Sequence, residues 1–295
     1  MRSKEKILPV LAILSCAMIW GLMWYPFRVL RDAGISGELA TFLGFAIALL
    51  IGLPLMGPIW RELRLAGRWG IVLMVSAGCT NLGYVMATLD GEVMRVLLLF
   101  YLAPLWTVLL SRWLLAEKLN RYGYGIVALS LAGALVMLSN TQPSVPLPQN
   151  RAEWIGLTAG MSFALLNVSV RRAQHLSVNF KTTSVWVGAV LFTAILLLYQ
   201  GSNVAQIQSI SSDAWWLLGL IGLVLCASSI VVQYGLTNMP ANQAIILFLS
   251  ELVFAALSAY LLTGERMGAR EIIGATLIVM ASLLSGKMYN LGKDK

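Results

Sequence analysis

The sequence has few charged residues, one histidine and three cysteines. Charged residues make up 12% of the 295, hydrophobic residues make up 59%, and the mean hydropathy is +0.80. Soluble domains are about a quarter charged, so a water-exposed globule of this length would lack the ionic surface it needs. Cys16, Cys79 and Cys226 lie far apart inside apolar runs, which excludes a disulfide framework. The composition therefore predicts an integral membrane protein.

Motifs for nucleotide or metal chemistry are also missing. The sequence contains no Gly-x-x-x-x-Gly-Lys-Ser/Thr phosphate loop, no His-Glu-x-x-His zinc motif and no stretch polar enough for a soluble nucleotide-binding domain. The net charge is +8, but the 21 lysines and arginines are spread in small groups between apolar runs, which excludes a nucleic-acid-binding patch. We therefore expect no enzyme, no catalytic residues, no cofactor, no metal and no nucleic-acid partner.

What the chain does contain is a series of long apolar stretches. Each is close to the length of about 20 residues that a helix needs to cross a bilayer. The sequence therefore predicts an all-α polytopic membrane protein, with the lipid bilayer as its surroundings. The ten expected transmembrane helices are residues 7–28, 37–56, 69–89, 93–114, 121–139, 154–171, 182–199, 214–236, 241–262 and 270–287.

Positive charges are divided unevenly between alternate connections. With the N-terminus in the cytoplasm, 15 of the 21 lysines and arginines fall on the cytoplasmic side and six on the other. Cytoplasmic loops are enriched in these residues, so we expect both termini to be cytoplasmic and the number of spans to be even. The cytoplasmic set includes Arg171, Arg172 and Lys181, between the sixth and seventh spans.

A polar stretch divides the chain near its middle. Residues 140–153 contain three of the nine prolines and separate the fifth span from the sixth. We therefore expect a first five-helix repeat over residues 1–139, a linker loop over 140–153 and a second five-helix repeat over 154–295.

The two halves also share a weak sequence register. Moving the second half back by 148 residues places Leu247-Phe248 on Leu99-Phe100, and Glu265-Arg266 on Glu117-Lys118. An odd number of spans makes the second repeat enter the membrane from the opposite side, which predicts inverted repeats. In carriers with inverted repeats, the two copies exchange conformations around a central site.

Several short motifs are distributed over the two halves. They are Trp20-Gly21, Pro104, Leu114-Leu115-Ala116-Glu117, Glu251 and Leu262-Thr263-Gly264-Glu265. Together they resemble the EamA family of the drug/metabolite transporter superfamily, over essentially the whole chain. Two positions depart from the family pattern: Ala116 stands where glycine is usual, and Leu252 stands where proline is frequent.

The resemblance implies a ten-helix carrier in the bacterial inner membrane. Members of the family usually export amino acids or related metabolites, driven by ion gradients or by exchange, so a small-molecule substrate is implied. Two other functional classes remain open from the residues alone. One is a membrane-embedded enzyme or lipid-handling protein, and the other is a membrane sensor that transports nothing.

Glu251 is the strongest candidate for a functional residue. It lies ten residues into the ninth expected span, near the centre of the bilayer, where an ionised carboxyl facing lipid costs about 2.5 to 3.5 kcal/mol. We therefore expect it to face protein or a hydrated cavity, and to couple protons to transport or hold a substrate ammonium. The alternative is a protonated glutamate that only links two helices.

Arg95 lies one turn into the fourth span, three residues after Glu92. One interpretation is a local ion pair with Glu92, with the guanidinium reaching the membrane surface. The other is a bidentate contact with a substrate carboxylate at the outer mouth of the cavity.

Other polar, aromatic and proline residues inside the spans are weaker candidates. Their side chains suit either a solute or helix packing. Pro104 removes a backbone hydrogen bond within the fourth span, so we expect a kink there that serves either as a gate hinge or as a static bend. The further candidates for the substrate site are Trp20, Asn81, Tyr84, Tyr101, Asn167 and Gln233.

Overall fold

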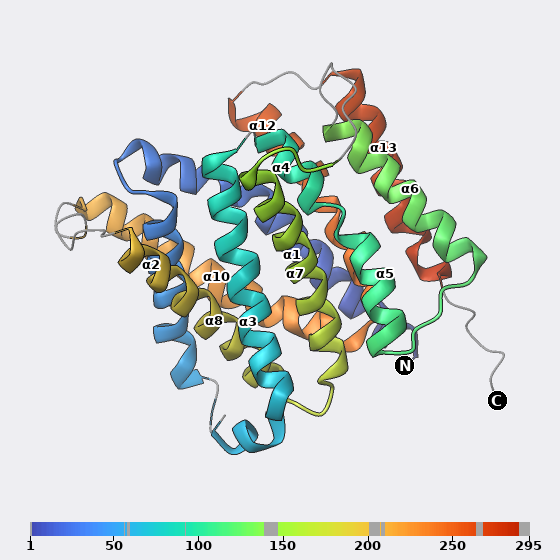
Figure 1. The fold of residues 1–295 in the computed structure, drawn as a ribbon, viewed down its shortest axis with the longest axis horizontal. Coiled ribbons are helices and arrows are strands. Elements are labelled where there is room, and N and C mark those ends of the chain that lie inside the picture. Colours follow the sequence, from blue (N-terminus) through green and yellow to red (C-terminus); the bar gives the residue numbers. More distant parts are fainter. Residues whose placement is uncertain are drawn as a thin grey trace.

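The computed structural model is a bundle of closely packed helices (Figure 1). It describes residues 2–55, 57, 60–91, 93–138, 147–200, 207, 210–263 and 268–288, and every regular element in these ranges is a helix. The α-helices are α1 (Arg2–Asp32), α2 (Gly37–Gly52), α3 (Trp60–Asp90), α4 (Val93–Phe100), α5 (Ala103–Leu114), α6 (Arg121–Leu138), α7 (Arg151–Arg172), α8 (Val178–Tyr199), α10 (Ser212–Asn238), α11 (Ala241–Phe248), α12 (Ser250–Thr263) and α13 (Ala269–Leu284). Short 3-10 turns follow α2 at Leu53–Leu55 and α13 at Ser285–Lys287.

The helices account for ten spans. In the described part of the chain, nine segments are long and apolar enough to cross a membrane, and the tenth, α2, is apolar but has only 16 residues. At 1.5 Å per residue α2 is about 24 Å long, shorter than a typical hydrocarbon core. The prediction of an all-α, ten-span membrane protein is thus confirmed, although the second span is shorter than expected.

The fourth and ninth spans are each interrupted in the middle. The fourth consists of α4 and α5, separated at Tyr101 and Leu102. The ninth consists of α11 and α12, separated at Leu249. The breaks follow Phe100 and Phe248, which lie 148 residues apart, in the register that the sequence predicts for the two halves.

The halves interlock through equivalent helices. In the first half, α3 packs against α7 and α8, the first and second spans of the second half. Its counterpart α10 packs against α1 and α2 in the same way, and the fifth spans α6 and α13 pack against each other. Equivalent helices of the two halves thus make equivalent contacts with the opposite half, as expected of two structural repeats.

Close contacts between helices give their relative directions. Gly133 of α6 lies against Ile278 of α13, and Met137, one turn later, lies against Gly274, one turn earlier, so these helices are antiparallel. In Figure 1 the pair runs side by side at the right of the bundle. For fifth spans, antiparallel packing is what inverted repeats require.

The first span of each half supports the same conclusion. α10 runs antiparallel to α1, since Gly235 lies against Ile13 while Cys16 contacts Ser228, further back on α10. α3 and α7 are also antiparallel. Because α1 and α3 are separated by one returning span, they run in the same direction, and α1 and α7 therefore run in opposite directions.

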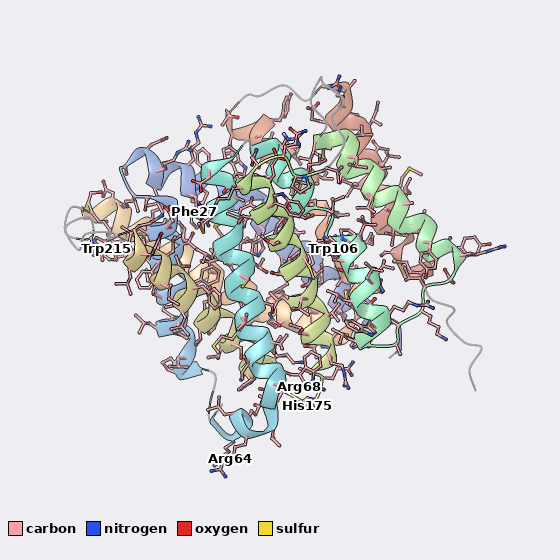
Figure 2. The ribbon with its side chains drawn as sticks, viewed as in Figure 1. Phe27, Arg64, Arg68, Trp106, His175 and Trp215 are labelled. Carbon is pink, nitrogen blue, oxygen red and sulfur yellow. The ribbon has the colours of Figure 1, made fainter. Side chains whose placement is uncertain are left out.

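The bundle has two ends. The end at which α1 begins and α13 ends carries the turns at 115–120, 173–177 and 239–240, and we call it the terminal end. Figure 2 shows Arg64, Arg68 and His175 together at this end. The opposite end carries the turns at 33–36 and 147–150.

Side-chain size differs between the inside and the outside of the bundle. Large apolar side chains such as Leu50, Trp216 and Leu283 are 74–81% exposed. Between helices, small residues allow close approach: a Cβ on Gly160 would meet the carbonyl oxygen of Phe100. Apolar surface outside and small residues at helix contacts are typical of a bundle surrounded by lipid.

Candidate substrate site

Glu251 lies on the first turn of α12, directly after the break in the ninth span. Gly21 of α1 packs against this turn, where a Cβ would be 2.8 Å from the carbonyl oxygen of Glu251 and 2.7 Å from the Cβ of Phe254. Two turns after Glu251, the Ser258 hydroxyl accepts a hydrogen bond from Trp24 Nε1 at 2.8 Å and donates to the carbonyl oxygen of Gly21 at 3.0 Å. The Trp20-Gly21 motif thus holds α1 directly against the acidic turn.

The Glu251 carboxyl faces the first half of the chain. The Tyr101 hydroxyl, from the break between α4 and α5, is placed to donate a hydrogen bond to it, and Tyr84 of α3 is close enough to interact electrostatically. Glu251 is half-buried and Tyr101 is buried. The acid therefore lies between the two repeats, against one helix break from each of them.

Aromatic rings line the region between the breaks. The Phe100 ring is 5.2 Å from Tyr84, 5.3 Å from Tyr101 and 5.5 Å from Phe163, measured between centroids. Phe163 of α7 also contacts Phe248 at 5.5 Å. The two phenylalanines that precede the breaks are thereby joined through one ring of the sixth span.

Pro104 explains the first break in local terms. It lies in the first turn of α5, where it has no N–H to donate to the carbonyl of Phe100 four residues earlier. The sequence predicts a kink at this position, and the structure shows a full interruption of two residues.

Asn81, Trp20 and Tyr84 are half-buried, but they are not equivalent in their bonding. Asn81 Nδ2 donates to the carbonyl oxygen of Ala77 on its own helix at 2.9 Å, which leaves the side-chain oxygen for other contacts. Trp20 packs against the large hydrophobic core cluster. Of the aromatic candidates, Tyr84 and Tyr101 are the ones that interact with Glu251.

Asn167 and Gln233 are almost completely buried, with 1% and 2% of their surface exposed. Neither polar atom of the Asn167 amide has a hydrogen-bond partner within the described chain, and the same is true of Gln233 Oε1. Buried amides are normally paired, so these atoms are free to bind a polar group.

Arg95 has a partner that the sequence did not indicate. Its Nε is 2.7 Å from Glu153 Oε1, and one terminal nitrogen is 3.0 Å from Glu153 Oε2, a bidentate ion pair between α4 and α7. Glu153 also accepts from Gln149 N at 2.8 Å and from Asn150 Nδ2 at 2.9 Å. Glu92, the partner expected from spacing, lies outside the described residues. In this conformation the Arg95 fork is bound by the protein's own carboxylate.

The terminal end contains a cationic cluster that we did not predict. Arg171 donates to the carbonyl oxygen of Thr237 at 2.6 Å and lies 3.8 Å from Glu117 Oε1. Lys181 Nζ donates to the Thr237 hydroxyl at 3.0 Å. The sequence placed Lys181 in a cytoplasmic connection, whereas it is fully buried in the first turn of α8. Its position four residues before Val185, on a face with other buried residues, was the available signal.

The acidic residues that end the fourth and ninth spans have different outcomes. Glu117 is joined to Arg171, but its counterpart Glu265-Arg266 lies outside the described residues.

Among the residues that the structure describes, no three His, Cys, Asp or Glu side chains gather as a metal site would require. The polar groups instead suit recognition of a small solute with charged or hydrogen-bonding groups.

Known proteins resemble this chain over nearly its whole length. The model of the EamA-like transporter family matches residues 7–139 and 150–286. An uncharacterized transporter of Archaeoglobus fulgidus is 26% identical over 256 residues, 86% of this chain and 88% of that protein. The uncharacterized transporter YwfM of Bacillus subtilis is 25% identical over 285 residues, 93% of this chain and 92% of that protein.

A solved structure has the same fold, with a TM-score of 0.73 at 17% identity, covering 94% of this chain and 96% of that one. The paired family matches agree with the two interlocked repeats, and the relatives are named as transporters. The chain therefore belongs to the EamA-like transporter family of the drug/metabolite transporter superfamily, and it is a multi-pass membrane transporter rather than an enzyme.

Proposed function

We propose that this transporter is a secondary active exporter of small organic solutes, such as amino acids or related metabolites, that works by alternating access. The observation that carries the proposal is the position of Glu251, an acid at the contact between two inverted repeats and beside a break in each. Inverted repeats around a shared polar site are the architecture that lets one protein open to either side in turn.

We propose Glu251 as the coupling residue. A carboxyl at this depth is costly to ionise unless it binds a proton, a cation or a hydrogen-bond donor. Tyr101 supplies one donor, and a proton or a substrate ammonium supplies the remaining compensation. If the proton and the substrate ammonium bind this carboxyl in turn, export of the solute is linked to entry of the proton.

The remaining candidate residues have supporting roles in this proposal. Tyr84 and Tyr101 are proposed as the aromatic wall near the acid, with Trp20, next to Gly21, extending it in other conformations. Asn81, Asn167 and Gln233 are proposed to offer amide groups to the solute. Arg95 is proposed to meet a substrate carboxylate in conformations where Glu153 releases it. Pro104 is proposed as the hinge of a gate, because the break that it begins carries Tyr101.

We propose that the protein lies in the bacterial inner membrane with both termini in the cytoplasm. Positive charge supports this orientation, since Arg64, Arg68, Arg171, Arg172 and Lys118 all lie at or near the terminal end. We also propose that residues 140–153 form a linker between a first repeat over 1–139 and a second over 154–295. The two family matches support a division in this region, since they leave residues 140–149 between them, and residues 139–146 lie outside the described ranges.

The test is uptake of labelled amino acids into proteoliposomes, with and without an imposed pH gradient. We expect a gradient-dependent flux of at least one solute, and we expect Glu251→Gln to reduce it by at least about tenfold, the cost of one charged hydrogen bond. Glutamine keeps the shape but removes the proton and the charge.

Glu271→Gln is the matched control, because it makes the same change in the first turn of α13 at the far end of the chain. Its flux should equal that of the wild type. Normal pH-dependent transport by Glu251→Gln would remove the acid from the mechanism.

A further inference from the structure

Lys181 is a buried cation whose environment contains too little negative charge. None of its surface is exposed, and its ammonium donates a hydrogen bond to the neutral hydroxyl of Thr237 at 3.0 Å. Within the described residues, no carboxylate lies within 4.0 Å of its ammonium. Burying an ammonium without an anion costs several kcal/mol, so this arrangement needs a further explanation.

The charged groups nearest to Lys181 do not supply an anion in direct contact with it. Arg171 and Glu62 are the ones that act on it, and Arg171 adds a second positive charge. Glu62 attracts the ammonium only from beyond 4.0 Å, and its two oxygens accept from the Ser177 backbone N–H at 2.7 Å and from the Ser177 hydroxyl at 2.6 Å. Glu117 reaches Arg171 only at 3.8 Å. Two cations therefore converge on Thr237, and the two carboxylates near them, Glu62 and Glu117, make no close contact with the Lys181 ammonium.

Polar atoms without partners lie next to this cluster along the same helices. Asn167 is four residues before Arg171 on α7, and Gln233 is four residues before Thr237 on α10. Residues at this spacing share a helix face, so both amides lie one turn deeper into the bundle on the faces that carry the cationic cluster. Both are buried amides with atoms that lack hydrogen-bond partners in the described chain.

We propose that Lys181 and Arg171 bind the carboxylate of the transported solute at the terminal end of the bundle, and that Asn167 and Gln233 bond its remaining polar groups. This inference rests on the proposed export function and narrows the substrate class to carboxylate-bearing solutes. The carboxylate of the solute supplies the negative charge that the protein does not place in contact with Lys181. Since Lys181 is fully buried, the site opens only in conformations that separate α8 from α10.

The experiment measures ligand-induced stabilisation of the purified full-length protein in detergent, followed by tryptophan fluorescence during heating. The probes are the free amino acids and their carboxamides, which keep the ammonium and the side chain but lack the carboxylate. We expect at least one amino acid to raise the unfolding midpoint, with its carboxamide needing at least about tenfold more ligand for the same shift.

Three variants assign the effect to Lys181. Lys181→Met should raise the half-saturating amino acid concentration by at least about tenfold, while Lys181→Arg keeps part of the response. Lys118→Met makes the same change on an exposed side chain at the same end and should behave as the wild type. Methionine matches the length of lysine, and replacing an uncompensated buried charge by an apolar group should leave the ligand-free midpoint unchanged or raise it.

Several results would overturn the inference. They are equal stabilisation by acids and carboxamides, no stabilisation of the wild type by any amino acid, and a Lys181→Met variant with a lower midpoint but a normal ligand response. Proteoliposomes separate this failure from failure of the proposed function. If the wild type transports the amino acids and their carboxamides equally well, the export proposal is kept and the proposed carboxylate site is wrong. If it transports neither, the export proposal itself fails.

Discussion

The two halves of the protein share one fold but differ in chemistry at equivalent positions. In the 148-residue register, the end of α4 matches the end of α11, and the start of α6 matches the start of α13. Within this register Glu251 corresponds to Ala103, and Arg95 corresponds to Gln243. Repeated hydropathy and helix breaks are enough to build the scaffold twice, whereas the charges of Glu251 and Arg95 each occur in one half only.

The helix breaks show the same contrast. The first half has Pro104 after its break, and the second half has Leu252 at the matching position. The second break nevertheless forms, at Leu249, without any proline. Tertiary packing therefore holds one break, and proline contributes to the other. Substitutions that copy second-half residues into the first half test how far the halves are interchangeable.

The largest effect is expected for Arg95→Gln, which copies Gln243. It leaves Glu153, whose side chain is 2% exposed, without its cation, so we expect a loss of about 3 kcal/mol in the free energy of unfolding, measured by denaturation in detergent. The double variant Arg95→Gln with Glu153→Gln should recover most of that loss. If the stable double variant also fails to transport carboxylates, Arg95 acts on the substrate as well as on Glu153.

A smaller effect of opposite sign is expected for Ala116→Gly, which copies Gly264. Ala116 has a φ of 55°, in the left-handed region that costs residues with a Cβ about 1 to 2 kcal/mol. We therefore expect a gain of about 1 kcal/mol in unfolding free energy. Ala128→Gly, at an exposed position within regular α6, is the control and should lose about 1 kcal/mol. A loss at both positions would contradict the interpretation.

The smallest effect on stability is expected for Pro104→Leu, which copies Leu252. Since packing maintains the second break without proline, we expect the unfolding free energy to change by less than about 1 kcal/mol. If Pro104 is a gate hinge, initial uptake into proteoliposomes should fall severalfold. Unchanged uptake would assign it a static role.

The backbone geometry at Ala116 explains why the family usually has glycine at this position. The family pattern has glycine before the glutamate, and the left-handed backbone at this position is the conformation that favours glycine. The glycine of the motif therefore suits the turn, and Ala116 keeps the same turn at a cost in stability. Sequence comparison detects the substitution, but the backbone angle gives its physical meaning.

The sequence by itself determined the spans, the repeat register and the presence of one deeply placed acid. These three features depend on hydropathy and spacing along the chain, which are local properties and can therefore be predicted without coordinates. The kink at Pro104 belongs to the same class, because proline removes a hydrogen bond wherever its helix lies.

Only the tertiary structure decided which groups meet. Arg95 contacts Glu153, 58 residues away, because α4 of the first half packs against α7 of the second. Lys181 contacts Thr237, 56 residues away, because α8 packs against α10 within the second half. Lys181 also changes from an expected surface cation to a fully buried one. Partner choice depends on which helix faces meet across the bundle, and hydropathy along a single helix carries no information about that contact.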